Sequence, residues 1–214
     1  MDDFASIWKG GYYEGDPMGP KSPSSYGDLS NMSILHATYL RCIKPYVSAE
    51  KVALEIGPGR GAWSRCMLGF KELHVMDPVL PAVSGFWDYV GDQANVFYHI
   101  ISDYSCNQLE DNSIDYMFSF GTFCHIPQEG IIAYAENLSN KLRYGADCFW
   151  MIADRHKYFK STGRSIEELE QGPGRWYGSS IELICHILRT AGYKIIDPDV
   201  GTCLRDPIIY FRKE

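Results

Sequence analysis

The sequence lacks both a long apolar run and a basic run. None of its apolar stretches approaches the roughly 18 residues that a membrane-spanning helix needs. The N-terminus, MDDFASIWKGGYYEGDP, is acidic and has no pattern of charged residues followed by apolar ones, as a secretory signal has. Twenty Lys and Arg against 27 Asp and Glu give a net charge of −7. We therefore expect a cytoplasmic protein that neither spans a membrane nor binds nucleic acid.

The sequence also lacks paired cysteines and internal repeats. Its seven cysteines are odd in number, widely spaced and free of any CxxC pair. This pattern argues against a disulfide framework and against a structural zinc site, and most of the cysteines are expected to be small buried side chains. A chain of 214 residues is long enough for one ordinary domain and too short for two.

Aromatic residues are abundant, at 14% of the chain. Aromatic side chains line pockets as well as cores, so their positions are informative. Several lie in residues 1–30, a segment rich in Gly, Pro, Ser and Tyr without a regular period. We interpret residues 1–30 as an irregular arm that covers a site, and residues 31–214 as the folded domain.

Apolar runs of strand length alternate with segments of helical spacing from residue 31 onward. The spacing predicts helices over 31–46, 61–70, 130–142 and 181–190. It predicts parallel strands over 51–56, 73–76, 96–101, 114–120 and 148–153, and a final antiparallel pair over 193–196 and 207–211. The sequence thus predicts an α/β fold, a three-layer αβα sandwich with a mostly parallel seven-stranded sheet that ends in an antiparallel hairpin. Residues 154–178 show no such pattern and are interpreted as a lid over a substrate.

The end of the first predicted strand reads Glu55-Ile-Gly-Pro-Gly-Arg-Gly61. Ligands of such sheets bind beyond the carboxyl ends of the strands, where glycines let the backbone approach closely. Asp77 closes the second strand and could accept hydrogen bonds from ribose hydroxyls. These features also fit a dinucleotide site, because Gly57, Gly59 and Ala62 satisfy GxGxx[G/A]. Glu55, just before the glycines, suits a ligand that carries a positive group.

With these residues the chain resembles the class I S-adenosylmethionine-dependent methyltransferases over residues 51–155. VALEIGPGRGAWSR (51–64) resembles the family's first motif, with an acidic residue two positions before GxGxG. The segments from Asp103 to Tyr116 and from Phe118 to His125 are similar to the family's regions around the fourth strand. The resemblance implies an enzyme with S-adenosyl-L-methionine as its cofactor. The cofactor-binding residues that it implies are Glu55, Gly57, Gly59, Gly61, Asp77, Asp103, Tyr104 and Phe120.

Methyl transfer to a hydroxyl needs a group that takes a proton. His125 after the fourth strand and His156 after the fifth are the candidates, with Asp154 as a residue that could orient a histidine. A metal held by Asp154 and His156 is an alternative, but their spacing is not that of a metal site, and no metal is predicted.

Aromatic residues of the arm and the lid are the candidates for contact with the ligands. The ring of Tyr13 could lie against the sulfonium or the adenine, beside Tyr12 and Tyr26 of the same arm. Arg175 and Trp176 lie on a glycine-flanked loop suited to closing over a polar acceptor. Tyr12, Tyr26, Arg175 and Trp176 are therefore predicted to bind the substrate.

These observations predict a methyltransferase that acts on a small-molecule or glycan-like acceptor, at a hydroxyl oxygen, by in-line displacement. The arm resembles that of bacterial enzymes that modify sugars or surface glycans. Two alternatives stay open at this stage. One is an NAD(P)-dependent oxidoreductase that holds a dinucleotide in the glycine loop, and the other is a module that binds S-adenosylmethionine without catalysis.

Overall fold

The computed structural model describes residues 15–23, 27–171 and 175–214. These residues form a seven-stranded sheet in the order β5-β4-β3-β6-β7-β9-β8, with a separate hairpin of β1 (Asp28–Leu29) and β2 (Met32–Ser33). The strands of the large sheet are β3 (Val52–Ile56), β4 (Glu72–Asp77), β5 (Val96–Ile100), β6 (Ile114–Ser119), β7 (Leu142–Met151), β8 (Tyr193–Asp197) and β9 (Ile208–Lys213). β3 to β7 run parallel, and β9 runs antiparallel to both β7 and β8. The predicted sheet, with its final antiparallel pair, is confirmed.

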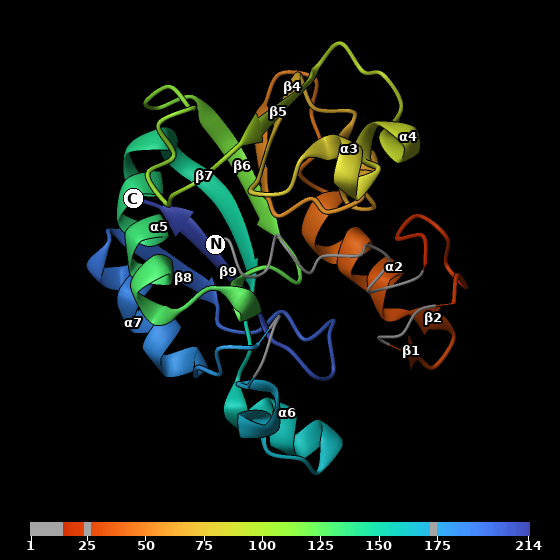
Figure 1. The fold of residues 1–214 in the computed structure, drawn as a ribbon, viewed down its shortest axis with the longest axis vertical. Coiled ribbons are helices and arrows are strands. Elements are labelled where there is room, and N and C mark those ends of the chain that lie inside the picture. The colour runs from red at the N-terminus through yellow and green to blue at the C-terminus, as the bar shows by residue number, and fades with distance from the viewer. Residues whose placement is uncertain (1–14, 24–26, 172–174) are drawn as a thin grey trace.

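Helices cover both faces of this sheet, as Figure 1 shows. One face packs against α5 (Gln128–Lys141) and α7 (Ile181–Thr190). The other face packs against short elements, which are α2 (Ile34–Thr38), η1 (Tyr39–Ile43), η2 (Ser64–Met67), α3 (Pro81–Ser84) and α4 (Phe86–Val90). β3 is buried over its whole length because both of its faces are covered, and its five residues therefore read as an apolar run interrupted only by Glu55.

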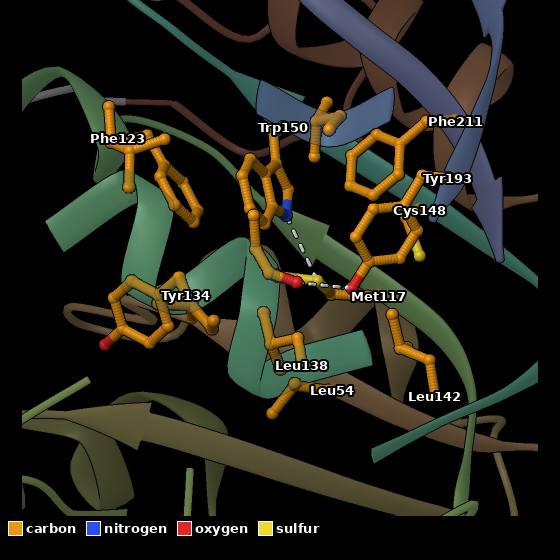
Figure 2. Close-up of a cluster of buried hydrophobic side chains, with 14 of the residues drawn as sticks. Leu54, Met117, Phe123, Tyr134, Leu138, Leu142, Cys148, Trp150, Tyr193 and Phe211 are labelled. Atoms are coloured by element: carbon orange, nitrogen blue, oxygen red, sulfur yellow. Dashed lines mark hydrogen bonds between the residues drawn. The ribbon is translucent and has the colours of Figure 1, made fainter. Parts of the chain in front are cut away.

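The core on the α5 side fixes the end of β6 against β7. Figure 2 shows Trp150 of β7 stacked on Phe123, with the two ring centroids 4.0 Å apart. The indole Nε1 of Trp150 donates to Met117 Sδ at 3.1 Å, and the hydroxyl of Tyr193 donates to the carbonyl oxygen of Ala135 at 3.0 Å. Phe123 begins η3 (Phe123–His125), so this packing holds the loop after β6 in place.

Two predicted helices differ from the structure. The helix expected over 31–46 begins only at Ile34, because Ser33 caps it and the preceding residues form the β1–β2 hairpin. Its second half is a π-helix, η1. The helix expected over 61–70 is reduced to the 3₁₀-helix η2, because Gly61 adopts a φ of +93° within a turn that its amide closes onto the Pro58 carbonyl at 2.8 Å.

Residues 154–178 contain more regular structure than predicted. α6 (Arg155–Thr162) and η4 (Ile166–Leu169) lie within this segment, and α6 projects at the lower edge of the molecule in Figure 1. The sequence shows no helical spacing here because α6 buries a single side chain, Tyr158, while its other aromatic residue, Phe159, is exposed. A small cluster of buried side chains holds this segment against the domain, made by Cys124, Ala153, Tyr158 and Ile166 with Leu169 and Trp176 beside them.

All seven cysteines are free and buried, as the sequence predicts. None of the helices in the described ranges is both long enough and apolar enough to cross a bilayer.

Candidate active site

The glycine loop follows β3 at the carboxyl edge of the sheet. The amide of Gly57 donates to the Met76 carbonyl at 2.9 Å, which ties the start of the loop to the neighbouring strand β4. Gly57, Gly59 and Gly61 have φ values of +73°, +54° and +93°, a conformation that residues with a Cβ rarely adopt. A Cβ on Gly57 would lie 2.0 Å from Thr122 Oγ1, so the loop passes directly against the segment that follows β6.

Asp77 lies at the end of β4 beside this loop. Its Oδ1 accepts the Val79 amide at 2.8 Å, and its Oδ2 lies 3.4 Å from the Gly59 amide. The residue is 6% exposed, and this burial raises its pKa from 3.8 to about 6. A carboxylate has about four acceptor positions, so two backbone donors leave lone pairs for the hydroxyls of a ligand.

Glu55 is buried beneath the loop. It accepts a hydrogen bond from the hydroxyl of Ser64, the first residue of η2. Burial, with a smaller contribution from the negative charge of Asp77, raises the pKa of Glu55 from 4.5 to about 8. Its carboxyl group is therefore protonated at neutral pH.

The other residues predicted to bind the cofactor follow β5 and β6. Asp103 is exposed and accepts hydrogen bonds from the amide and the hydroxyl of Ser105, which lower its pKa. Tyr104 packs edge-on against Tyr134, with the ring centroids 5.1 Å apart. Phe120 is buried, and its ring centroid lies 4.7 Å from that of Trp63. Phe120 therefore contributes its ring to the core under the glycine loop.

His125 ends η3, and the structure brings it together with Arg175 and Trp176. The Nδ1 of His125 lies 3.2 Å from the carbonyl oxygen of Arg175, and the His125 ring meets the Trp176 ring edge-on with centroids 5.9 Å apart. A carbonyl oxygen only accepts hydrogen bonds, so Nδ1 carries the proton in this contact. In the neutral ring Nε2 is then the basic nitrogen.

Asp154 and His156 lie at the start of α6, where Asp154 binds backbone amides. Both oxygens of the buried Asp154 accept backbone amides, Oδ1 from Lys157 at 2.6 Å and Oδ2 from Ile181 at 2.9 Å. This carboxylate is thus the N-cap of α6 and also accepts the first amide of α7, whose own N-cap is Ser180. His156 is exposed on the first turn of α6.

Three predicted residues, Tyr12, Tyr13 and Tyr26, lie outside the described residues. No group of three or more His, Cys, Asp or Glu side chains within the described ranges is suited to hold a metal ion.

The sequence reasoning missed four residues that the structure places at this edge of the sheet. Thr122 contacts the glycine loop, and Tyr177 hydrogen-bonds the Cys124 carbonyl through its amide at 2.7 Å. Arg205 lies over the Trp176 ring at 4.5 Å and donates through Nε to Asp206 Oδ2 at 2.7 Å. Asp206 is fully buried, and its Oδ1 has no hydrogen-bond partner in the described part of the chain. Only the tertiary fold brings Arg205 and Asp206 here, since no motif surrounds them.

Comparison with solved structures identifies the fold. No protein-family model matches the sequence, and no curated protein matches it. The YcgJ protein from Bacillus subtilis is 14% identical with a TM-score of 0.64, over 84% of this chain and 98% of that chain. A SAM-dependent methyltransferase from Aquifex aeolicus is 18% identical with a TM-score of 0.60, over 81% of this chain and 92% of that one.

A third similar structure was solved with ligands. It is the 1,6-didemethyltoxoflavin-N1-methyltransferase of Burkholderia thailandensis with bound 1,6-didemethyltoxoflavin and S-adenosylhomocysteine. It is 16% identical to this chain with a TM-score of 0.60, over 84% of this chain and 77% of that one. The chain therefore has the fold of class I S-adenosylmethionine-dependent methyltransferases, as its motifs predict.

Proposed function

We propose that this chain is an S-adenosylmethionine-dependent methyltransferase that acts on a small-molecule or glycan-like acceptor at a hydroxyl oxygen. The observation that carries the proposal is the contact between Gly59 and Asp77, which unites the glycine loop and the acid of the next strand in one site. The fold supports it, because the mostly parallel sheet with β9 antiparallel between β7 and β8 matches that of solved methyltransferases.

The residues present fit the cofactor. The partly satisfied carboxylate of Asp77 would accept the ribose hydroxyls, and Gly57, Gly59 and Gly61 would let the backbone approach the amino-acid portion. Glu55 would support the loop from below through Ser64. The proposal assigns Asp103 and Tyr104 to the adenine side. Phe120, and Tyr13 from the arm, are also assigned to the cofactor.

S-adenosylmethionine supplies an electrophilic methyl group on a sulfonium, which leaves as a neutral thioether. The acceptor oxygen must lose its proton as it gains the methyl group, and His125 would take that proton at Nε2. The Arg175 carbonyl would hold the His125 ring in the required tautomer. Trp176 would border the acceptor beside it, and Tyr12 and Tyr26 would cover the site from the arm.

Asp154 and His156 receive no proton-transfer role in this proposal. Asp154 instead fixes the start of residues 154–178, the segment that would border the acceptor, because it accepts a first-turn amide from each of two helices. The Burkholderia structure supports a small-molecule acceptor class, since that methyltransferase holds the small molecule 1,6-didemethyltoxoflavin beside S-adenosylhomocysteine.

Calorimetric titration tests the proposal against its oxidoreductase alternative. We expect saturable binding of S-adenosylmethionine and S-adenosylhomocysteine, and no displacement of either by NAD(P)H. Saturable NAD(P)H binding with no heat from either sulfur ligand would favour the oxidoreductase. Methyl transfer to an acceptor pool, followed by mass spectrometry, then separates an enzyme from a module that only binds the cofactor.

A further inference from the structure

Arg175 belongs to a segment whose backbone is held on two sides. The amide of Trp176 donates to the Leu169 carbonyl at 2.7 Å, which ties the segment to η4. The amide of Tyr177 donates to the Cys124 carbonyl at 2.7 Å, which ties it to η3. The Arg175 carbonyl itself accepts from His125. Arg175 is therefore fixed next to the proposed base, although its own side chain is exposed.

The guanidinium of Arg175 is held by Tyr177. Its Nε donates to the Tyr177 hydroxyl at 2.7 Å, and its central carbon lies 5.0 Å from the centroid of the Tyr177 ring. An arginine has five N–H donors in a rigid fork, so this contact uses one and leaves the terminal NH₂ groups in a set orientation. Such an orientation lowers the entropic cost of binding a planar or tetrahedral anion.

Arg175 has no carboxylate partner among the described residues. The other cations close to this segment are paired: Arg155 with Glu167 and Glu170, Lys157 with Asp199, and Arg205 with Asp206.

Two contacts locate Arg175 relative to the proposed base. The Nδ1 of His125 lies 3.2 Å from the Arg175 carbonyl oxygen, and the guanidinium of Arg175 lies over the Tyr177 ring, two residues along the same segment. The guanidinium is thus held on the backbone segment that contacts His125. In a chain of net charge −7, an acidic acceptor would be repelled unless a cation were placed to receive it.

From this geometry we propose that the acceptor carries an acidic group, a carboxylate or a phosphate monoester, and that Arg175 binds that group while the hydroxyl faces His125. The inference rests on the proposed function, because it names the acceptor class of the same site. The two anions share the property that matters, two or more oxygens that a guanidinium can bind at once.

Nuclear magnetic resonance of the arginine Nε–H groups tests the proposal with simple probes. The signal of Arg175 is assigned by its absence in Arg175→Gln. The full-length protein is titrated with benzoate, phenyl phosphate and neutral benzamide, with and without saturating S-adenosylhomocysteine. We expect saturable shifts of this signal with one or both anions and none with benzamide. The stronger of benzoate and phenyl phosphate identifies the acidic group as carboxylate or phosphate.

Matched variants complete the test. Arg175→Gln should weaken anion binding by about tenfold or more, read from ligand-observed spectra. Arg164→Gln removes an exposed arginine just beyond α6 and should leave anion binding unchanged. Tyr177→Phe keeps the ring and removes the hydroxyl that orients Arg175. We expect its loss of anion affinity to lie between those of Arg164→Gln and Arg175→Gln.

The proposal is overturned if benzamide binds as well as the anions, if neither anion gives a saturable shift, or if Arg175→Gln binds them like the wild type. Failure of the proposed function looks different. In that case the anions still bind through Arg175, but calorimetry detects no S-adenosylhomocysteine binding.

Discussion

Gly57 and Thr122, 65 positions apart in the chain, are in such close contact that a Cβ on the glycine would lie 2.0 Å from the threonine Oγ1. The Thr122 hydroxyl also donates to the carbonyl oxygens of Ile56, at 3.2 Å, and of Gly57, at 3.4 Å. This contact joins the glycine loop after β3 to the loop after β6. The proposed cofactor and acceptor regions are therefore mechanically connected through one glycine.

Gly57→Ala is expected to destabilise the protein and to weaken S-adenosylhomocysteine binding. The variant combines left-handed backbone strain of about 1–2 kcal/mol with overpacking of about 1–3 kcal/mol against Thr122. Gly145→Ala is the matched control, because Gly145 has a φ of +81° and no atom lies within 4 Å of the position that its new Cβ would take. Urea unfolding should show a larger loss for Gly57→Ala. Equal losses would mean that the Thr122 contact is unimportant.

Glu55 should make the protein less stable as the pH rises. Its folded-state pKa of about 8 exceeds the ordinary value of 4.5, so the folded state holds the proton more tightly than the unfolded state. The stabilisation is present below about pH 4.5 and is lost as the pH rises towards 8. Glu55→Gln should remove this part of the pH dependence, measured as the free energy of unfolding between about pH 5 and pH 9.

Ser64→Ala provides the control for Glu55. The Ser64 hydrogen bond lowers the pKa of Glu55, so its removal should extend the loss of stability to higher pH. A wild-type stability that rises over the same pH range, with Glu55→Gln showing the same slope, would contradict the assignment of a neutral buried carboxyl.

The contacting histidines His74 and His99 should make the protein less stable as the pH falls. His74 Nδ1 lies 2.9 Å from His99 Nε2, and burial lowers the pKa of both rings below 6.5. The unfolded state then binds more protons, so stability is lost as the pH falls below 6.5. Glu72 and Glu110 face His74 and partly oppose this effect.

Urea unfolding at about pH 7 and pH 5 checks this expectation. His99→Asn should lose less stability on acidification than the wild type, since one half-buried proton acceptor is gone. His186→Asn changes an exposed histidine on α7 and should behave like the wild type. If His99→Asn and the wild type were equally sensitive to acid, the histidine pair would not be the cause.

Asp154→Ala should cost about 2 kcal/mol or more of folding free energy, because it removes the N-cap of α6 and leaves the Lys157 and Ile181 amides without their partner. Ser165→Ala removes a single cap, that of η4, and should cost about 1 kcal/mol. Thermal unfolding of both variants makes the comparison. If Asp154→Ala lost no more folding free energy than Ser165→Ala, Asp154 would not be stabilising both helices.

The strands and the mostly parallel sheet were predictable because buried parallel strands are nearly continuous apolar runs. β3 and β4 were recognised within one residue of their bounds, and their adjacency brings Gly59 and Asp77 together. The polar helix α6 was not predictable by the same rule, since it buries only Tyr158. A helix that buries so little surface gives no apolar period to detect.

The residues of the candidate site also differ in how far local sequence reveals them. Its glycine loop was recognisable because local backbone geometry demands glycine. The contact between His125 and Arg175 joins residues 50 positions apart. The hydrogen bond from Ile181 to Asp154 joins residues 27 positions apart. Such contacts arise from tertiary packing, and local sequence patterns do not predict them.

Titration of Asp77→Ala with S-adenosylhomocysteine by calorimetry tests the central claim most directly. The wild type should bind saturably, and the variant should lose about 1–3 kcal/mol of binding free energy, because the ribose hydroxyls lose their acceptor. Asp92→Ala, which removes an acid before β5, should bind like the wild type. Equal affinity of Asp77→Ala and the wild type, or no binding by the wild type, would contradict the account.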